Sequence, residues 1–189
     1  MKLKSRRAYL LFIFFLPLFA QAQGVEGELA KNQFKIDFLL PGLAFERAIN
    51  KNMSLVIDSH LGASSIKNKA GNDEKIIAMQ LVSLQYRYYL TLKKRHAKGK
   101  STLTNSGLYT GFIAEQSIFY GSSKSTLLSK AALGSGWQKT FRKGFNLNIF
   151  GGAGYTDGIN IKAKIRPTIN LSLGVVLGVK KKYEASLRQ

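Results

Sequence analysis

Cysteine is absent from the sequence, and acidic residues are few. Without cysteine the chain has no disulfide framework, no thiolate chemistry and no lipidated N-terminal cysteine. The 29 Lys and Arg residues outnumber the 10 Asp and Glu residues, which leaves a formal net charge of +19 over 189 residues. A charge of this size favours nucleic acid or an anionic membrane surface as a partner. Because no helix-turn-helix, zinc-finger or ribonucleoprotein motif accompanies the charge, we expect no nucleic acid partner.

Long hydrophobic runs are also missing. Beyond Ala20, no apolar run approaches the roughly 18 residues of a transmembrane helix. The N-terminal run from Tyr9 to Ala20 is too short to span comfortably as a helix; basic residues precede it and an A-x-A cleavage site ends at Ala22. We therefore expect a secretory signal peptide over residues 1–22, with an uncleaved membrane anchor as the alternative. An exported chain of this kind is periplasmic, secreted or an outer-membrane barrel.

What the sequence has instead is alternation. From Arg166 to Val179, apolar residues occupy one parity, and the other parity is mostly polar or very small. Successive side chains of a β-strand point to opposite faces, so this stretch predicts a strand with one wholly apolar face. Its length is about that of a membrane-spanning β-strand. The residues that we expect to face lipid are Ile169, Leu171, Leu173, Val175 and Leu177.

The same pattern recurs along the chain. It predicts further strands at residues 34–40, 43–47, 53–62, 76–90, 107–120, 133–142 and 145–155. Pro41-Gly42 separates the first two strands, because proline and glycine mark turns. One kinked strand over residues 33–47 is the alternative. We expect a flexible lead-in at residues 23–32, a barrel over 33–179 and a basic tail at 180–189.

Eight strands allow an antiparallel, up-and-down sheet to close with both termini on one side. Closure matters in lipid, which cannot satisfy the N–H and C=O groups of an open sheet edge. The expected fold is therefore all-β, a closed eight-stranded antiparallel transmembrane barrel with external loops at 63–75, 121–132 and 156–166. Such a barrel carries aromatic girdles at both rims. We expect them to consist of Phe34, Phe45, Tyr86, Tyr88, Phe141, Phe145, Tyr120 and Tyr155.

Three parts of the chain resemble a known family. They are Leu43-Ala44-Phe45-Glu46-Arg47, Leu84-Gln85-Tyr86-Arg87-Tyr88-Tyr89-Leu90, and Phe145-Asn146-Leu147 with Gly151-Gly152-Ala153-Gly154-Tyr155. These segments are similar to small outer-membrane β-barrel proteins of the Bacteroidota, many of unknown function, with an architecture similar to OmpX/OmpA-type eight-stranded barrels. The resemblance covers residues 33–179 and implies a fold and a compartment, not an activity. Such barrels commonly finish on an aromatic strand residue, whereas this chain ends in a basic, polar tail.

Charged residues on the inner parity require partners, because an isolated desolvated charge is very costly. We therefore expect a structural network of salt bridges and hydrogen bonds that fills a narrow lumen. A gated ion or proton path is the alternative. The residues expected in the network are Lys35, Asp37, Glu46, Arg87, Glu115 and Arg142, with the last four at its centre.

Catalysis has little support in the sequence. Asp58 and His60 are neighbours on one strand face and could serve an acyl-transfer site if a serine joined them. No G-x-S-x-G motif or metal-spaced histidine cluster accompanies them, so we expect no catalytic residue, no cofactor and no metal. The basic segment 91–106 predicts a solvated loop, or alternatively a contact with anionic lipid headgroups or envelope polymers.

The expected function is a non-enzymatic outer-membrane barrel with a structural or surface-interaction role through its loops. The expected partners are outer-membrane lipid, lipopolysaccharide and the outer-membrane assembly machinery, and the expected state is a monomer. Two alternatives remain. One is an envelope lipid-modifying hydrolase or acyltransferase. The other is a soluble, secreted lipocalin-like barrel, which would carry its polar parity outside.

Overall fold

The computed structural model describes residues 29–67, 74–100, 102, 104–120, 126–141, 144–158 and 161–177. The expected signal peptide, most of the lead-in and the basic tail lie outside these residues. The strands are β1 (Asn32–Asp37), β2 (Gly42–Ala48), β3 (Met53–Lys67), β4 (Glu74–Tyr89), β5 (Gly107–Tyr120), β6 (Thr126–Thr140), β7 (Phe145–Gly158) and β8 (Ile161–Val176), with a short helix, α2 (Leu92–Ala97), between β4 and β5.

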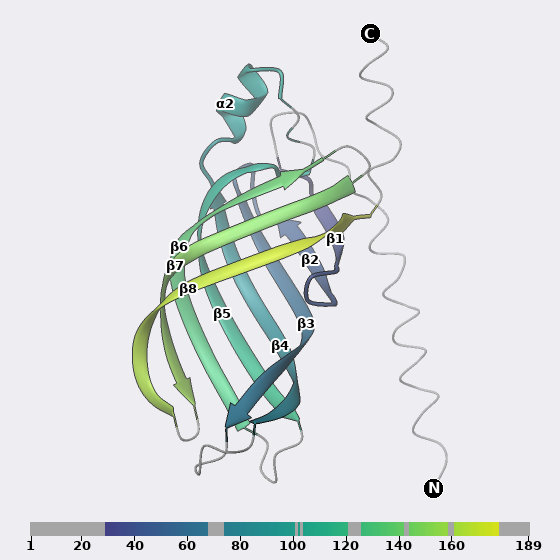
Figure 1. Cartoon of the computed structure of the whole chain (residues 1–189). Helices are drawn as coiled ribbons and strands as arrows, with labels where there is room; N and C mark the ends of the chain where they lie inside the picture. Colours follow the sequence, from purple (N-terminus) through teal and green to yellow (C-terminus); the bar gives the residue numbers. More distant parts are fainter. Residues whose placement is uncertain are drawn as a thin grey trace, which may run out of the picture.

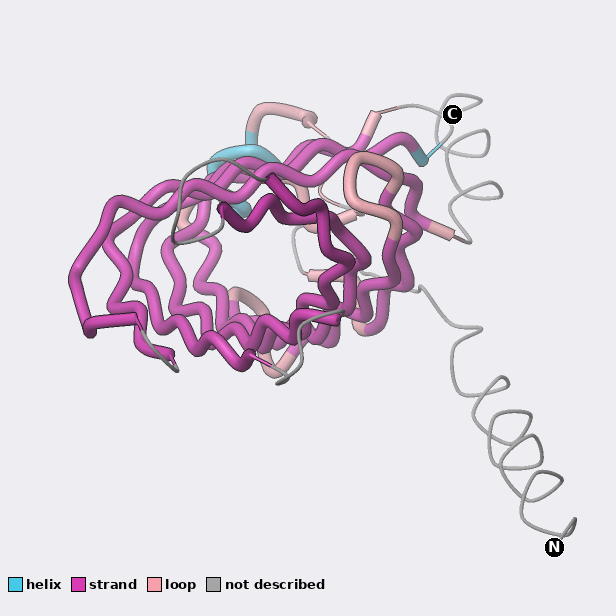
Figure 2. Tube along the Cα trace, turned by 60° about the horizontal axis from the view of Figure 1, so that its bottom comes forward, coloured by secondary structure: helices cyan, strands magenta, loops and turns pink. Residues whose placement is uncertain are grey.

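The strands form one closed antiparallel ring. Each strand pairs with the next in the sequence, and β1 pairs with β8 to complete the barrel. Figure 1 shows the tilted strands, and Figure 2 looks into the ring that they make. The expected all-β fold with eight antiparallel strands is thereby confirmed. Among the described residues, no helix is long and apolar enough to cross a membrane.

Four strands extend well into the predicted external loops. β3 continues to Lys67, β6 begins at Thr126 and β7 continues to Gly158, while β8 begins at Ile161 and ends at Val176. The predicted external loops at 63–75, 121–132 and 156–166 are therefore largely strand. Their Ser- and Lys-rich sequence hides the pattern, but long neighbouring strands hold them in register, as in the Glu115–Lys130 pair of β5 and β6. The connections that remain, 68–73, 121–125 and 159–160, lie outside the described residues.

The first two strands are separate and short. Phe34 pairs with Phe45 and Ile36 with Leu43 across a turn at Phe38–Pro41, so the single kinked strand is excluded. β1 has 6 residues and β2 has 7, whereas the other strands have 14 to 16. Figure 1 shows this short hairpin in the half of the barrel that carries α2, beside strands that continue to the opposite end.

The two faces of the wall differ sharply in exposure. Inward-pointing polar side chains such as Glu46 (0% exposed) are buried, while outward-pointing apolar ones such as Leu133 (67%) and Ile169 (80%) are exposed. This distribution reverses that of a water-soluble barrel, whose inner face is apolar.

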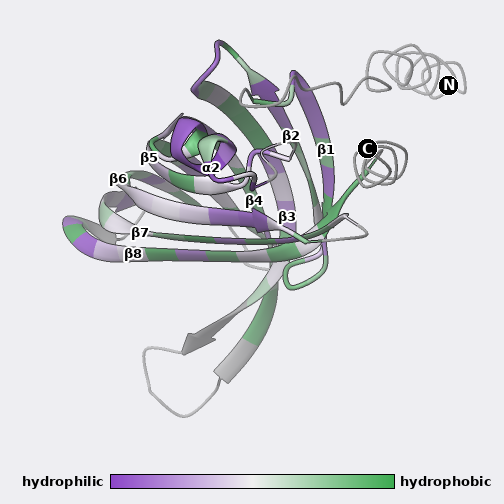
Figure 3. Cartoon of the chain, turned by 90° about the horizontal axis from the view of Figure 1, so that it is seen from above, coloured by the Kyte–Doolittle hydropathy of each residue, from purple (hydrophilic) through white to green (hydrophobic). Residues whose placement is uncertain are grey.

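The barrel end that carries α2 is closed by its own chain. Thr102, Asn105 and Ser106 are buried, and the Asn105 Oδ1 atom accepts a hydrogen bond from the Ala30 N–H at 2.7 Å. Asn105 adopts a φ of 53°, a left-handed conformation that asparagine tolerates better than most residues. The prediction of a solvated loop over 91–106 is wrong for Thr102 and residues 104–106, because these residues are buried in the mouth of the barrel. Figure 3 shows the hydrophilic α2 at the same end.

Candidate functional site

Glu46 is the centre of a charged network inside the barrel. It projects from β2, and its Oε2 atom lies 2.6 Å from the Lys35 Nζ of the paired strand β1. Its Oε1 atom accepts hydrogen bonds from the Ser54 hydroxyl at 2.7 Å and the Tyr89 hydroxyl at 2.8 Å. Because the carboxylate is fully buried, these partners replace the water that the charge loses.

Gln138 of β6 links this pair to Arg87 across the lumen. Its Oε1 atom accepts from the Lys35 Nζ at 2.9 Å and from the Arg87 Nη1 at 2.8 Å. Its Nε2 atom donates to the backbone carbonyls of Thr104 and Asn105. One amide therefore ties strands on opposite sides of the ring to the segment that closes the barrel end.

Arg87 extends the network along β4 in the direction away from α2. Its Nη2 and Nε atoms donate to the Gln85 Oε1 at 2.6 and 3.2 Å, and its Nη1 lies 3.8 Å from the Glu46 Oε2. The guanidinium also stacks 4.7 Å from the ring centroid of Tyr109 on β5. One carboxylate, Glu46, faces two cations, Lys35 and Arg87. The cation–π contact with Tyr109 therefore helps to stabilise the charge of Arg87.

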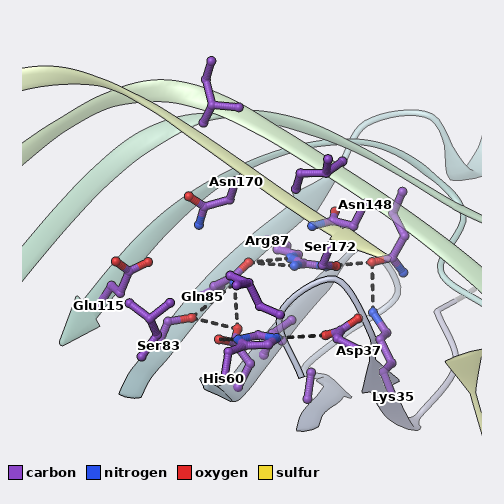
Figure 4. A pocket seen from close by; sticks show the side chains of 18 of the residues that line it. Lys35, Asp37, His60, Ser83, Gln85, Arg87, Glu115, Asn148, Asn170 and Ser172 are labelled. Atoms are coloured by element: carbon purple, nitrogen blue, oxygen red, sulfur yellow. Dashed lines mark hydrogen bonds and ion pairs between the residues drawn. The ribbon is translucent and has the colours of Figure 1, made fainter. Parts of the chain in front are cut away.

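A second cluster continues from Gln85. Its Nε2 atom and the Ser83 hydroxyl both donate to the Asp58 Oδ2 at 2.7 Å. His60 then lies between two carboxylates, with Nδ1 3.3 Å from the Asp58 Oδ1 and Nε2 3.0 Å from the Asp37 Oδ2. Figure 4 shows this chain of contacts from Arg87 to Asp37.

The His60 arrangement is not an acyl-transfer site. A catalytic histidine needs one ring nitrogen on the orienting carboxylate and the other on the nucleophile. Both nitrogens of His60 face carboxylates instead. The described residues contain no group of His, Cys, Asp or Glu that could hold a metal ion.

The network borders a cavity of about 270 Å³. The polar residues Asp37, Asp58, His60 and Asn170 line it, together with the apolar residues Leu40 and Leu171. Figure 4 shows Asn170 and Ser172 of β8 facing the His60 cluster across this space.

The structure brings together only some of the expected network residues. Lys35, Glu46 and Arg87 meet, and Asp37 joins through His60. Glu115 lies four positions along β5 from Gly111, the register partner of Arg87, and pairs with Lys130 at 2.8 Å instead. The expectation that Glu115 sits at the height of Glu46 and Arg87 is therefore wrong, because the register separates them. Arg142 lies outside the described residues.

Several interior residues escaped the sequence analysis. Gln138 is a neutral residue of the inner parity of β6, and Lys130 falls within the predicted loop 121–132. Tyr89, Tyr109 and Phe150 are buried on the inner parity and form an apolar cluster with Leu29, Leu92, Ile113 and Ala132. The period-2 pattern itself places these aromatics inside, beside Arg87, Glu115 and Asn148 of the same strands, and could have identified them.

The outward residues lie where the alternation predicted them. Of the expected lipid-facing set, Ile169, Leu171 and Leu177 are exposed, and Leu173 and Val175 are half-buried. Of the expected girdle, Phe34 and Phe45 are half-buried, and the exposed members are Tyr86, Tyr88, Tyr120, Phe141, Phe145 and Tyr155.

Comparison with known proteins gives no match. No protein-family model, no curated protein and no solved structure matches the chain.

Proposed function

We propose that the chain is a membrane-spanning β-barrel of the outer membrane, with an occluded polar lumen and a non-enzymatic, structural or surface-interaction role. The observation that carries the proposal is the reversed distribution of side chains. Buried, paired charges lie inside, and most of the outward-pointing large apolar side chains are exposed. Monomeric proteins in water rarely expose apolar patches of such extent.

Polar and aromatic residues divide this outer surface in the manner expected of a membrane span. On the outer face of β4, Val82, Leu84, Tyr86 and Tyr88 are exposed. Farther from α2 on the same face, Gln80 accepts a hydrogen bond from the Tyr120 hydroxyl at 2.8 Å. On the next two strands the Ser129 hydroxyl donates to the Gln116 Oε1 at 2.9 Å on the same outer face.

The stretch from Gln80 to Tyr88 therefore gives the apolar band a length close to the roughly 9–11 residues of a tilted spanning strand. The aromatic residues at both limits suit the two membrane interfaces. The N-terminal signal-peptide pattern favours export, and an exported barrel with an apolar exterior suits the outer membrane. Its partners there would be lipid, lipopolysaccharide and the assembly machinery, with the chain as a monomer.

The alternatives have weaker support. A soluble lipocalin-like barrel would bury apolar side chains and expose polar ones, the reverse of the arrangement here. A lipid-modifying hydrolase needs an activated nucleophile, and the histidine nearest to that role has both nitrogens occupied by carboxylates. The surface role also rests on shorter loops than the sequence suggested, since most of the predicted loop residues belong to strands.

Envelope fractionation tests the proposal. The protein expressed with its full N-terminus should sediment with outer membranes and resist extraction by high salt or carbonate. A salt-extractable protein would be held only by its positive charge, and recovery in the soluble periplasm would refute the proposal.

A further inference from the structure

The end of the barrel that carries α2 presents positive charge to its surroundings. Figure 1 shows α2 standing beyond the ends of the strands. The exposed cations at this end are Lys31, Arg47, Lys93, Lys94, Lys98 and Lys100. Among the described residues at the same end, the only acidic one is Glu46, which is buried in the lumen. These cations therefore have no exposed carboxylate of the described chain beside them.

The barrel holds α2 at its rim. Leu92 is 1% exposed and belongs to the inner apolar cluster that contains Tyr89 and Tyr109. The preceding residue, Thr91, accepts a hydrogen bond at its hydroxyl from the Leu108 N–H of β5 at 2.9 Å. Because the backbone of α2 is fixed in this way, its exposed lysines lose less conformational freedom when they meet a partner.

The positive charge continues onto the outer wall beside the girdle. Arg47 follows Phe45 by two positions on the outward side of β2. Lys139 lies between Trp137 and Phe141 on the outward side of β6, and its Nζ is 4.7 Å from the ring centroid of Phe141. A lysine beside an interfacial aromatic ring keeps its stem on apolar surface and its ammonium at headgroup level. We call Lys139 and the six exposed cations together the basic rim.

The position of Arg47 and Lys139 favours a lipid over a soluble partner. A soluble acidic polymer could approach α2, which stands beyond the strands. It would not reach the outward sides of β2 and β6 beside Phe45 and Phe141, because lipid occupies that space around a membrane barrel. The phosphate of a lipid headgroup lies at the level of the girdle and meets both parts of the basic rim. Attraction between basic residues and an anionic membrane surface acts within about one Debye length, so cations at the rim are well placed for it.

The opposite end of the barrel has mixed charge. Lys164 and Arg166 of β8 are exposed there, but the exposed carboxylate of Asp157 lies on the neighbouring strand β7, where Thr156 pairs with Lys164. Lys130 is paired with Glu115. The excess of exposed cations without carboxylates is therefore a property of the α2 end.

From these observations, and resting on the membrane-barrel function proposed above, we infer that the basic rim binds anionic glycerophospholipids of the leaflet on the α2 side. The headgroup phosphate contacts the ammonium groups of Lys139 and α2 and the guanidinium group of Arg47. In the orientation expected of an exported barrel, this leaflet is the periplasmic one. The rim selects a headgroup with a net negative charge, because the phosphate of a zwitterionic lipid is offset by its own ammonium group.

Trp137 is a built-in reporter for this contact, because it is the single tryptophan of the chain. It pairs with Leu108, whose carbonyl accepts from the Leu90 N–H at the start of the α2 segment, and it lies two positions from Lys139. The full chain is refolded into vesicles of phosphatidylcholine and phosphatidylglycerol with matched acyl chains, and one lipid at a time carries brominated chains. Quenching of Trp137 fluorescence then gives the relative binding constant of the two lipids. We expect phosphatidylglycerol to bind at least about fivefold more tightly, the effect of one cation near an anionic surface, and the preference to disappear in about 1 M salt.

Substitutions in and outside the basic rim locate the site. A triple variant with Lys93→Gln, Lys94→Gln and Lys139→Gln should bind the two lipids equally. Lys164→Gln is the matched control, since it removes an exposed cation from the opposite end, and it should keep the preference of the unmodified protein. A preference that survives the triple variant, or one that Lys164→Gln abolishes, would overturn the inference.

The same reporter separates this inference from the proposed function. Quenching of Trp137 by brominated phosphatidylcholine alone reports lipid contact on the outer wall, and no quenching by either lipid would refute the membrane barrel itself. Equal quenching by the two lipids in the unmodified protein would overturn the basic rim while the barrel stands. Binding of soluble polyglutamate to the vesicle-inserted protein, with no preference between the two lipids, would assign α2 to a soluble partner and overturn it as well.

Discussion

At the scale of single residues, the interior is held by one carboxylate that serves two cations. Glu46 pairs with Lys35 and approaches Arg87, and all three side chains are buried. A buried ion pair adds little net stability compared with a well-packed apolar replacement. Removing one partner is different, because the charges left behind keep the desolvation cost without the attraction.

Glu46→Gln should therefore destabilise the barrel by about 3–5 kcal/mol, measured as the change in the free energy of unfolding by urea in lipid vesicles. The substitution keeps the shape of the side chain but leaves two buried cations without a counter-charge. Glu115→Gln is the matched control, since the Glu115 and Lys130 side chains keep 14% and 18% of their exposure whereas Glu46 keeps none, and it should cost less than Glu46→Gln. Equal costs for the two variants would contradict a network centred on Glu46.

The sequence could assign the faces of these residues but not their partners. Period 2 puts Lys35, Asp37, Glu46 and Arg87 on the inner side of their strands, since that depends only on counting within a strand. Which of them meet depends on the register between strands, a property of the whole ring. Gln138 shows the limit most clearly, because nothing local marks a neutral amide as the contact between two cations.

At the scale of elements, the strand limits were less predictable than the strands. β6 was expected to start at Leu133, yet the ladder with β5 holds residues from Thr126 onward. Ser129, Lys130, Ala131 and Ala132 lack the strong alternation of the later part, and their extended conformation comes from pairing with β5 and β7. The short β1–β2 hairpin was visible in the sequence, because Pro41-Gly42 interrupts the pattern.

Two leucines on the outer face of β6 provide a depth test for the membrane. Leu133 lies within the apolar band, and Leu127 lies beyond the polar Ser129 on the same face; both are exposed. Leu133→Arg should cost about 2–4 kcal/mol in a lipid-refolding assay, and Leu127→Arg about 0–1 kcal/mol, because the cost of a lipid-facing Arg falls from the midplane to the interface. Similar costs at the two positions would show that the apolar band is assigned to the wrong residues or that the barrel does not lie in lipid.

At the scale of the whole molecule, we expect the lumen of the proposed membrane barrel to be blocked and not to form a pore. Thr102 and residues 104–106 are buried at one mouth, and Gln138 bonds to the carbonyls of Thr104 and Asn105. The Tyr109 and Phe150 rings stack at 6.4 Å deeper inside. Eight strands enclose an interior that side chains can fill, so the cavity of about 270 Å³ is a side pocket of an occluded barrel.

Planar-bilayer recordings of the purified protein should accordingly show no large, stable conductance. We expect the paired charges and the buried residues at the α2 end to leave no free path for ions. A porin-sized, long-lived conductance from the monomer would show that the segment 102–106 does not seal the barrel in a membrane.

The sidedness of the barrel follows from its even number of strands. Antiparallel strands in an even number return the chain to its starting side, so α2 and the N-terminal end of β1 share one end, where Ala30 bonds to Asn105. In the proposed outer-membrane barrel, we expect that end to face the periplasm after export. Trypsin added to intact cells should spare Lys93 and Lys94 of α2 and cut in the opposite connections, which contain Lys69 and Lys124. Permeabilising the outer membrane should allow trypsin to cleave at Lys93 and Lys94, which are exposed on α2. Cleavage in α2 on intact cells, with both opposite connections protected, would show that the orientation is inverted.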